Sequence, residues 1–256
     1  MASTRPGSEF TRIALIERLL SANAPRSPAV QVGIGDDAAV LRCKGGLIWS
    51  IDAAVEGVHF ERRWLTLQDV GYRAFQAALS DVAAMGARPL AALSNLALPR
   101  RFTSSELARL AEGQALAARD SRCPIVGGNL TRASELSVTT SVLGLAESPL
   151  LRSGARVGDE LWLAGQVGLA AAGLAALQAG RRPRTGSLAR CVDRWRRPSA
   201  LIQDGLRLSR RASAAIDVSD GLVGDAEHLA EASGVRVIVD AEALVAGLSD
   251  DLLQAA

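Results

Sequence analysis

Apolar and polar residues follow one another along this chain in blocks that predict a mixed α/β protein. Apolar side chains recur at helical spacing over residues 10–22, 67–85 and 104–121, a pattern typical of amphipathic helices. Short apolar runs bounded by Gly, Pro and Asp predict strands between these helices. The predicted strands are residues 30–34, 40–43, 47–51, 91–98, 124–126 and 136–145. Elements in this order indicate an α+β or mixed α/β domain that ends near residue 148.

A second domain is predicted beyond Pro149 and the Arg152-Ser153-Gly154 segment, which interrupt the apolar pattern. Its expected helices are residues 168–179, 199–211 and 222–232, and its expected strands are residues 160–164, 214–218 and 235–240. We therefore expect two domains, residues 1–148 and 149–256, each with a mixed sheet and flanking helices.

The composition is that of a globular protein without a strong preference for a polyanionic partner. The chain has 256 residues, of which 48% are apolar, so it can bury a substantial core. Its net charge of +2 does not favour nucleic acid or a membrane surface. Four Phe, four Trp and one Tyr are too few for the stacking platforms of single-strand binding proteins. We expect neither nucleic acid nor membrane as a partner.

Three scattered cysteines favour a reducing compartment. Cys43, Cys123 and Cys191 lack Cys-x-x-Cys spacing, which argues against a disulfide framework or a zinc site. The first turns are polar and charged, so no secretory signal is expected. The longest apolar stretch, residues 161–177, is short for a membrane span. We expect a cytoplasmic protein.

The single lysine of the chain excludes one common nucleotide-binding motif. Lys44 is followed by Gly45, so the sequence contains no Gly-x-x-x-x-Gly-Lys-Ser/Thr phosphate loop. If the protein binds nucleotides, it does so by another route.

Short aspartate motifs recur where apolar sequence stops, and they are the strongest indication of function. They are Gly33-Ile34-Gly35-Asp36-Asp37, Ser50-Ile51-Asp52, Ser80-Asp81 and Asp217-Val218-Ser219-Asp220-Gly221. A carboxylate at the end of a buried strand or on a buried helix face is costly unless a cation neutralises it. Several such oxygen ligands are typical of Mg²⁺, which keeps some waters and takes further ligands from substrate phosphates.

Asp81 is the best single argument for a metal site. It falls on the apolar stripe of the helix predicted over residues 67–85. It also lies in the last turn of that helix, where the helix dipole disfavours negative charge. A metal ion or an arginine would compensate both effects. The alternative is a solvated acid at the edge of an irregular stripe.

The first two aspartate motifs differ in how easily a structural role explains them. Asp36 and Asp37 could simply form a tight turn between two strands. Asp52 follows the apolar run of residues 47–51, which predicts a core strand. An acid in that position is more readily a ligand.

The last aspartate motif stands before a predicted helix. Asp217 ends the strand predicted over residues 214–218, and Ser219 or Asp220 could cap the helix that follows. Capping leaves unexplained why two aspartates flank the serine. A helix start of this kind is also a position that binds phosphate.

Two weaker signals lie elsewhere in the chain. Gly127-Gly128 follows a predicted strand, where glycines permit backbone N–H groups to approach a phosphate, although such a pair is more often a turn. His59 lies a few residues from Asp52 and could contact a substrate phosphate, whereas most lone histidines are structural. His228 falls within a predicted helix and is expected at its surface.

The order of these motifs resembles that of thiamine-monophosphate kinases. The motifs that carry the resemblance are Gly33-Ile34-Gly35-Asp36-Asp37, Asp52-x-x-Val55-Glu56-Gly57-x-His59-Phe60, Leu79-Ser80-Asp81-x-Ala83-Ala84-Met85-Gly86-Ala87-x-Pro89, Val126-Gly127-Gly128, Leu151-Arg152-Ser153-Gly154-Ala155-x-x-Gly158-Asp159 and Ile216-Asp217-x-Ser219-Asp220-Gly221-Leu222. That family belongs to the PurM-like ATP-binding superfamily, with aminoimidazole ribonucleotide synthetase and selenophosphate synthetase.

The resemblance implies transfer of the γ-phosphoryl group of ATP to thiamine phosphate, which gives thiamine diphosphate, without a Walker loop. By position in the motifs it implies Mg²⁺ ligands at Asp37, Ser50, Asp52, Asp81, Asp217 and Asp220. It implies ATP contacts at Gly128, Asn129, Arg152 and Ser219, and a contact between His59 and the substrate phosphate. It further implies a PurM-like two-domain fold, in which residues 1–148 bind ATP and Mg²⁺, and a homodimer whose N-terminal sheets pair across the two-fold axis.

Three features depart from the family pattern. Asn129 stands where the family has the aspartate of Gly-Gly-Asp, so a carboxylate ligand becomes a neutral amide. Ile51 stands where the family has the second hydroxyl residue of Ser/Thr-Thr-Asp, so we expect the loss of a hydroxyl ligand. The family also continues to a Gly-Gly-Glu-Asp-Tyr-Glu motif in the substrate pocket that this sequence does not contain, so we expect an incomplete second domain with uncovered apolar surface. Two alternatives therefore stay open: a non-catalytic or weakly active Mg·ATP-binding relative, and a superfamily enzyme with another phosphate acceptor.

Overall fold

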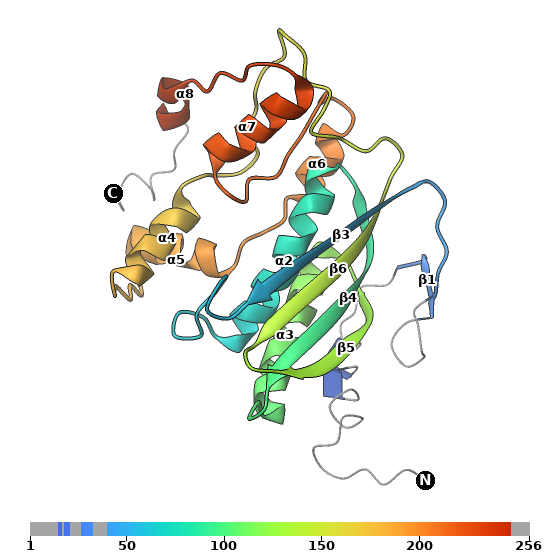
Figure 1. Ribbon diagram of the computed structural model, residues 1–256, viewed down its shortest axis with the longest axis vertical. Coiled ribbons are helices and arrows are strands. Elements are labelled where there is room, and N and C mark those ends of the chain that lie inside the picture. Colours follow the sequence, from blue (N-terminus) through green and yellow to red (C-terminus); the bar gives the residue numbers. More distant parts are fainter. Residues whose placement is uncertain (1–14, 17, 21–26, 33–39, 247–256) are drawn as a thin grey trace. The chain divides into compact units, whose positions relative to one another are not determined.

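The computed structural model describes residues 15–16, 18–20, 27–32 and 40–246, and the chain forms two compact units (Figure 1). Unit 1 holds the described residues up to Val82 together with Arg88–Glu147. Unit 2 holds Ala83–Ala87 and the described residues from Ser148 onward. Of the helix predicted over residues 10–22, the described positions 15–16 and 18–20 are helical.

Unit 1 is built on a mixed four-stranded sheet. Its strands are β3 (Gly46–Val55), β4 (Arg88–Pro99), β5 (Ile125–Ala133) and β6 (Ser137–Ala146), in the order β3-β6-β4-β5. β6 is antiparallel to both of its neighbours, whereas β4 and β5 are parallel. Two short strands, β1 (Val30–Val32) and β2 (Val40–Leu41), form a separate antiparallel pair. The predicted mixed α/β fold class is confirmed.

Two long helices, α2 (Leu67–Ala84) and α3 (Ser104–Ser121), cover one face of this sheet (Figure 1). They approach each other closely because glycine stands at the contact. A Cβ atom added at Gly71 would lie 2.1 Å from the carbonyl oxygen of Leu110, and one at Gly113 would lie 2.0 Å from that of Gln68. Both helices agree with their predicted ranges, and α3 begins after a capping box formed by Thr103 and Glu106.

The two faces of the sheet differ in burial. Alternate side chains such as Ile48, Val138 and Val142 are buried beneath the helices, on what we call the helix face. The neighbouring positions Trp49 and Ile51 are 75% and 68% exposed on the opposite, open face. This alternation follows from the period of two in a strand. Only residues that project from the same face of the sheet can share a site on it.

Three strands, β3, β4 and β5, are longer than predicted, and in β3 and β5 the added residues include candidate site residues. β3 continues to Val55, so Asp52 lies inside the strand and not beyond its end. β5 continues to Ala133, so Gly127-Gly128 lies inside a strand and not in a turn. The apolar runs stop early at both places, but the ladder hydrogen bonds to β6 and β4 continue. Backbone pairing, which does not depend on side-chain polarity, explains the difference.

Unit 2 is helical wherever regular structure is described. Its helices are α4 (Leu169–Gln178), α5 (Gly186–Arg196), α6 (Ile202–Leu208), α7 (Leu222–Ser233) and α8 (Ala241–Ala246). Three of them, α4, α6 and α7, lie within or close to predicted ranges, whereas α5 and α8 were not predicted. The signal for α5 is present, because Ala189, Val192 and Trp195 are buried at a spacing of three residues in a helix that also holds four arginine and aspartate residues.

The strand predictions for unit 2 are wrong. Residues 160–164, 214–218 and 235–240 are described, and none of them is in a strand. Their large apolar side chains are largely exposed; Trp162 is 80% and Ile238 71% exposed. An apolar run predicts an extended segment, but a strand also needs a neighbour that accepts and donates ladder hydrogen bonds.

No described helix is both long enough and apolar enough to cross a membrane. Within the described part of the chain, Cys43, Cys123 and Cys191 form no disulfide. Burial raises the pKa of the Cys123 thiol to about 12, so this group stays protonated at neutral pH.

Candidate active site

The candidate metal ligands of β3 lie on the helix face of the sheet. Ser50 and Asp52 are two residues apart and both half-buried, so they project to the same side as the buried Ile48. Ile51 lies between them on the open face. The replacement of a hydroxyl residue by Ile51 therefore removes no side chain from the face that carries Ser50 and Asp52.

Asp81 of α2 meets this face directly. The hydroxyl group of Ser50 donates a short hydrogen bond to Oδ2 of Asp81, which joins residues 31 positions apart in the sequence. Asp81 is half-buried, as its place on the apolar stripe predicted. No described arginine forms an ion pair with it, so the hydroxyl of Ser50 is its observed polar partner.

Arg73 is a further charged residue of this region that sequence reasoning missed. It lies eight residues before Asp81 on α2 and is half-buried. Burial lowers the pKa of its guanidinium, and the nearby carboxylate of Asp52 opposes that shift. Asp52 also accepts a 2.7 Å hydrogen bond from the backbone N–H of Ala53. A positive charge beside one of the candidate ligands is thus part of the site.

The described residues fit a magnesium ion bound jointly with a substrate, although not one bound by protein alone. Among them, no group of three or more His, Cys, Asp and Glu side chains is close enough to hold a metal. Mg²⁺ usually takes only one or two carboxylates and completes its octahedron with water and phosphate oxygens. Ser50, Asp52 and Asp81 supply hard oxygen atoms of this kind. Asp37 lies outside the described residues, and Asp217 and Asp220 lie in unit 2.

His59 is exposed and held in one orientation. Its Nδ1 accepts a 3.1 Å hydrogen bond from the backbone N–H of Val55, the last residue of β3. In the neutral imidazole the proton is then on Nε2, so this exposed edge of the ring can donate a hydrogen bond to an anion. This is the chemistry that a contact with a substrate phosphate requires.

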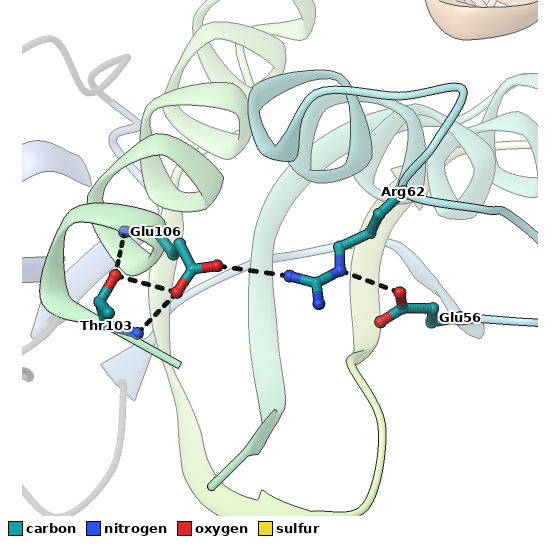
Figure 2. A network of polar contacts seen from close by, with 4 residues as sticks. All are labelled: Glu56, Arg62, Thr103 and Glu106. Atoms are coloured by element: carbon teal, nitrogen blue, oxygen red, sulfur yellow. Dashed lines mark hydrogen bonds and ion pairs between the residues drawn. The ribbon is translucent and has the colours of Figure 1, made fainter. Parts of the chain in front are cut away.

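The segment that carries His59 is tied to the start of α3 (Figure 2). Arg62 Nε lies 2.9 Å from Glu56 Oε1, and Arg62 Nη1 lies 3.4 Å from Glu106 Oε1. The other oxygen of Glu106 accepts hydrogen bonds from the N–H and the hydroxyl of Thr103. The N–H of Thr103 is the main reason why the pKa of Glu106 is lowered. One arginine therefore joins the end of β3 to a helix cap.

Gly128 and Asn129 lie at the opposite edge of the sheet from Ser50 and Asp52. β3 and β5 are the two edge strands, separated by β6 and β4, which is three inter-strand spacings or about 14 Å. A Cβ atom at Gly128 would lie 1.8 Å from the carbonyl oxygen of Ser94, so only glycine fits there. Asn129 Nδ2 donates a 3.0 Å hydrogen bond to Asn95 Oδ1. Unit 1 does not bring these two sets of residues together.

The Asp217–Gly221 segment of unit 2 is not a side-chain helix cap. The N-cap of α7 is Gly221, and neither Ser219 nor Asp220 caps the helix with its side chain. Instead, Oδ2 of the buried Asp225 accepts the backbone N–H groups of Ser219, Asp220 and Gly221, at 3.0, 3.2 and 3.1 Å. The capping explanation is therefore wrong. An own-chain carboxylate also occupies the N–H groups that could otherwise bind a phosphate, which leaves the exposed side chains of Ser219 and Asp220 for contacts.

The side chain of Arg152 is exposed, and hydrogen bonds from two other segments hold the backbone at Arg152 and Leu151. Ser233 Oγ donates a 2.8 Å hydrogen bond to the carbonyl oxygen of Arg152, and Ala215 N–H donates a 2.9 Å bond to that of Leu151. Asp159 accepts hydrogen bonds from the Ser213 hydroxyl and the Arg156 N–H, which lower the pKa of its carboxyl group. Sequence reasoning missed Asp225 and Ser233, although Asp225 lies on an apolar stripe with Ala226 and Leu229, the signal that singled out Asp81.

Comparisons with known proteins show which family the chain and its fold resemble. A family described as "AIR synthase related protein, N-terminal domain" matches residues 35–146. The chain is 34% identical over 237 residues to a thiamine-monophosphate kinase of Aquifex aeolicus, with 92% of this chain and 74% of that protein covered. Its structure resembles the thiamine-monophosphate kinase of Stenotrophomonas maltophilia with a TM-score of 0.85 and 34% identity, covering 94% and 77% of the two chains. The structure of AaThiL complexed with AMPPCP and TMP gives a TM-score of 0.79 at 33% identity, covering 100% and 79%.

The fold and the motifs thus define an AIR synthase-related, PurM-like protein. Within that class, the chain belongs to the thiamine-monophosphate kinase family.

Proposed function

We propose that this protein is a thiamine-phosphate kinase, which transfers the γ-phosphoryl group of ATP to thiamine phosphate and forms ADP and thiamine diphosphate. The observation that carries the proposal is the contact between Ser50 and Asp81. Two candidate ligands from separate motifs meet on one face of unit 1, in a chain whose relative AaThiL has been observed with AMPPCP and TMP.

We assign the ATP- and Mg²⁺-binding role to unit 1, which corresponds to the domain expected over residues 1–148. Asp37, Ser50, Asp52 and Asp81 would hold Mg²⁺ from this domain, and Asp217 and Asp220 would add ligands from the second domain, expected over residues 149–256. When bound, Mg²⁺ supplies charge neutralisation for the phosphate oxygens. The carboxylate groups would present their oxygen atoms as ligands to the metal. The hydroxyl of Ser50 orients one of these oxygen atoms, Oδ2 of Asp81.

The remaining roles concern the two substrates. His59 would donate its Nε2 proton in a hydrogen bond to the phosphate of thiamine phosphate, since Nδ1 is engaged by Val55. Gly128, Asn129, Arg152 and Ser219 would contact ATP. Little covalent help from the protein is needed, because phosphoryl transfer depends mainly on positioning and on electrostatic stabilisation.

One observation favours a second candidate, a Mg·ATP-binding relative with weak or no turnover. Asn129 stands where the family has an aspartate, and its amide forms a neutral hydrogen-bonded pair with Asn95. A neutral pair contributes less to binding a metal–phosphate complex than a carboxylate would. Restoring the acid with Asn129→Asp separates the two candidates, because turnover that rises at least about tenfold identifies the amide as the cause of weak activity.

The open face of the sheet supports a homodimer. Leu47, Trp49, Ile51 and Leu93 are 54%, 75%, 68% and 43% exposed on β3 and β4, which makes an apolar surface of the kind that a second subunit covers. We therefore propose that two copies pair through this face. A cytoplasmic location is proposed from the dispersed, unbridged cysteines.

The test of the proposed function is a coupled assay on purified protein, with ATP and thiamine phosphate as substrates and thiamine diphosphate measured directly by chromatography. We expect thiamine diphosphate and ADP in equal amounts, and loss of both when Mg²⁺ is removed with a chelator. ATP binding by calorimetry without thiamine diphosphate formation would identify the second candidate instead.

A further inference from the structure

Helix α7 forms polar contacts at both of its ends with segments that carry candidate ATP contacts. At its start, the carboxylate of Asp225 receives three backbone N–H groups of the Ser219–Gly221 segment. At its end, Ser233 is bonded to the segment of Arg152. All of these residues belong to unit 2.

The contact at Asp225 fixes the backbone of the first segment. Only 3% of Asp225 is exposed, so its charge depends on hydrogen bonds for stabilisation. Three successive N–H groups that converge on one oxygen atom leave the segment little freedom to turn. Gly221 adopts φ = +120°, which permits this tight path before the helix. The side chains of Ser219 and Asp220 take no part in these bonds and are exposed.

The contact at Ser233 fixes the second segment in the same way. Its hydroxyl donates to the carbonyl oxygen of Arg152 at 2.8 Å and accepts the N–H groups of Gly154 and Ala155, each at 3.2 Å. Gly154 has φ = +137°, and a Cβ atom on it would lie 2.4 Å from the carbonyl oxygen of Ser213. The backbone around Arg152 is therefore held by one hydroxyl and by close packing.

We propose that α7 acts as one positioning element for the nucleotide, in which Asp225 sets the Ser219–Gly221 segment and Ser233 sets the Arg152 segment. Eight residues of helix separate the two, about 12 Å along the axis, so a rigid rod fixes the spacing of the two segments. The inference rests on the proposed function, since it takes Ser219 and Arg152 as ATP contacts. Asp225 and Ser233 themselves touch no reacting atom; they are positioning residues.

A purely structural role for α7 predicts different kinetics. If Asp225 and Ser233 only stabilised the fold, their variants would lose active protein while the Michaelis constants of the remaining enzyme stayed unchanged. If they position the ATP contacts, KM for ATP rises and KM for thiamine phosphate, whose proposed contact is His59 in unit 1, stays the same. The split between the two constants distinguishes the roles.

The experiment compares Asp225→Ala, Asp225→Asn, Ser233→Ala and Ser233→Thr with the wild-type protein. Glu227→Ala and Glu231→Ala are the matched controls, because both are exposed acids on the same helix. For each variant, circular dichroism checks folding, steady-state kinetics gives KM for ATP and for thiamine phosphate, and calorimetry gives Kd for Mg·ATP without the second substrate.

We expect Asp225→Ala to raise KM and Kd for ATP at least about tenfold, as loss of a charge-assisted hydrogen-bond set implies. Asp225→Asn keeps an acceptor oxygen and should fall between Asp225→Ala and wild type. Ser233→Ala should raise both constants about threefold to tenfold, and Ser233→Thr, which keeps the hydroxyl, should restore them. The controls and KM for thiamine phosphate should stay within about twofold of wild type.

Unchanged KM and Kd for ATP in folded Asp225 and Ser233 variants would overturn the inference. If Asp225→Ala does not fold, the Michaelis and dissociation constants of Asp225→Asn, Ser233→Ala and Ser233→Thr test the inference in its place. A wild-type protein that binds Mg·ATP without turnover would contradict the proposed function but leave this inference to be judged from Kd alone. A wild-type protein that binds no Mg·ATP would contradict both.

Discussion

The two units respond differently to the same kind of sequence. In unit 1, apolar runs such as residues 91–98 become strands that pair along their full length, and β3 forms a continuous ladder with β6 from Gly46 to Val55. In unit 2, the equally apolar residues 160–164 and 235–240 have no strand partner and leave Trp162 and Ile238 exposed. Local pattern thus predicts that a segment is extended, whereas pairing depends on what lies beside it.

The acids of the two units show a second contrast. Asp81 in unit 1 is half-buried and has one observed donor, the hydroxyl of Ser50, so its carboxylate keeps capacity to bind a cation. Asp225 in unit 2 is buried and receives three backbone donors on one oxygen. Both acids lie on apolar helix stripes. The number of hydrogen-bond donors to each carboxylate therefore distinguishes the candidate metal ligand, Asp81, from Asp225, which fixes the backbone of a neighbouring segment.

The largest expected effect is on catalysis. Asp81→Asn removes a charge that the proposed metal site needs, so kcat should fall at least about a thousandfold. The free energy of unfolding should change by no more than about 1 kcal/mol, because the hydroxyl of Ser50 can still donate to the amide oxygen. Asp193→Asn, an exposed acid on α5, is the control. Kinase assays and urea unfolding measure both quantities. Full activity in Asp81→Asn would show that this carboxylate is not a ligand.

The same glycine substitution should act with opposite signs in the two units. Gly113→Ala places a Cβ atom 2.0 Å from the carbonyl oxygen of Gln68, whereas nothing lies within 4 Å of the corresponding atom at Gly224 of α7. We expect Gly113→Ala to lower the free energy of unfolding by about 2–4 kcal/mol and Gly224→Ala to raise it by about 0.5–1 kcal/mol. Equal effects in urea titrations would contradict the close packing of α2 on α3.

A matched pair of valines tests the difference between the strands. Val138 is fully buried on β6, and Val239 in the unpaired segment is 37% exposed. Val138→Thr buries a hydroxyl and should cost about 1–3 kcal/mol of unfolding free energy, whereas Val239→Thr should cost less than about 0.5 kcal/mol. Equal costs would mean that residues 235–240 are packed as firmly as β6.

The smallest expected effect concerns the cap of α3 and its pH dependence. The pKa of Glu106 is lowered in the folded protein, chiefly by the N–H of Thr103. Its contribution is therefore complete above the ordinary pKa of a glutamate and is lost as the pH falls through the lowered value. Glu106→Gln should cost about 0.5 kcal/mol at pH 7, because the group is partly exposed, and the cost should shrink as the pH falls through the lowered pKa. A cost that does not shrink with falling pH, measured by urea unfolding at a series of pH values, would point to a contribution other than charge.

The sequence predicted the helices of unit 1 closely because an apolar stripe and a cap specify a helix locally. The range 104–121 was correct at both ends, where Thr103 caps the start and Arg122 ends the helix in the left-handed conformation. It did not predict that β3 and β5 continue through Asp52 and Gly128, since polar residues inside a strand interrupt the pattern that identifies it. These interruptions coincide with candidate site residues, and local sequence rules are expected to fail most often at such sites.

Part of the candidate site was also within reach of the sequence. The meeting of Ser50 and Asp81 follows from the strand period and the helix stripe, once both elements are placed on each other. The separation of Gly128 from Asp52 by three strand spacings could not be predicted in this way, because the strand order β3-β6-β4-β5 is a tertiary property. The roles of Asp225 and Ser233 depend on contacts between distant segments, which one sequence does not specify.

The most direct measurement is the formation of thiamine diphosphate from thiamine phosphate and ATP by the purified protein. The contact between Ser50 and Asp81, on the face of β3 that also carries Asp52, predicts a reaction that requires Mg²⁺ and disappears in Asp81→Asn, but not in Asp193→Asn. No product at saturating Mg²⁺, ATP and thiamine phosphate, from a wild-type protein that is folded by circular dichroism, would contradict it.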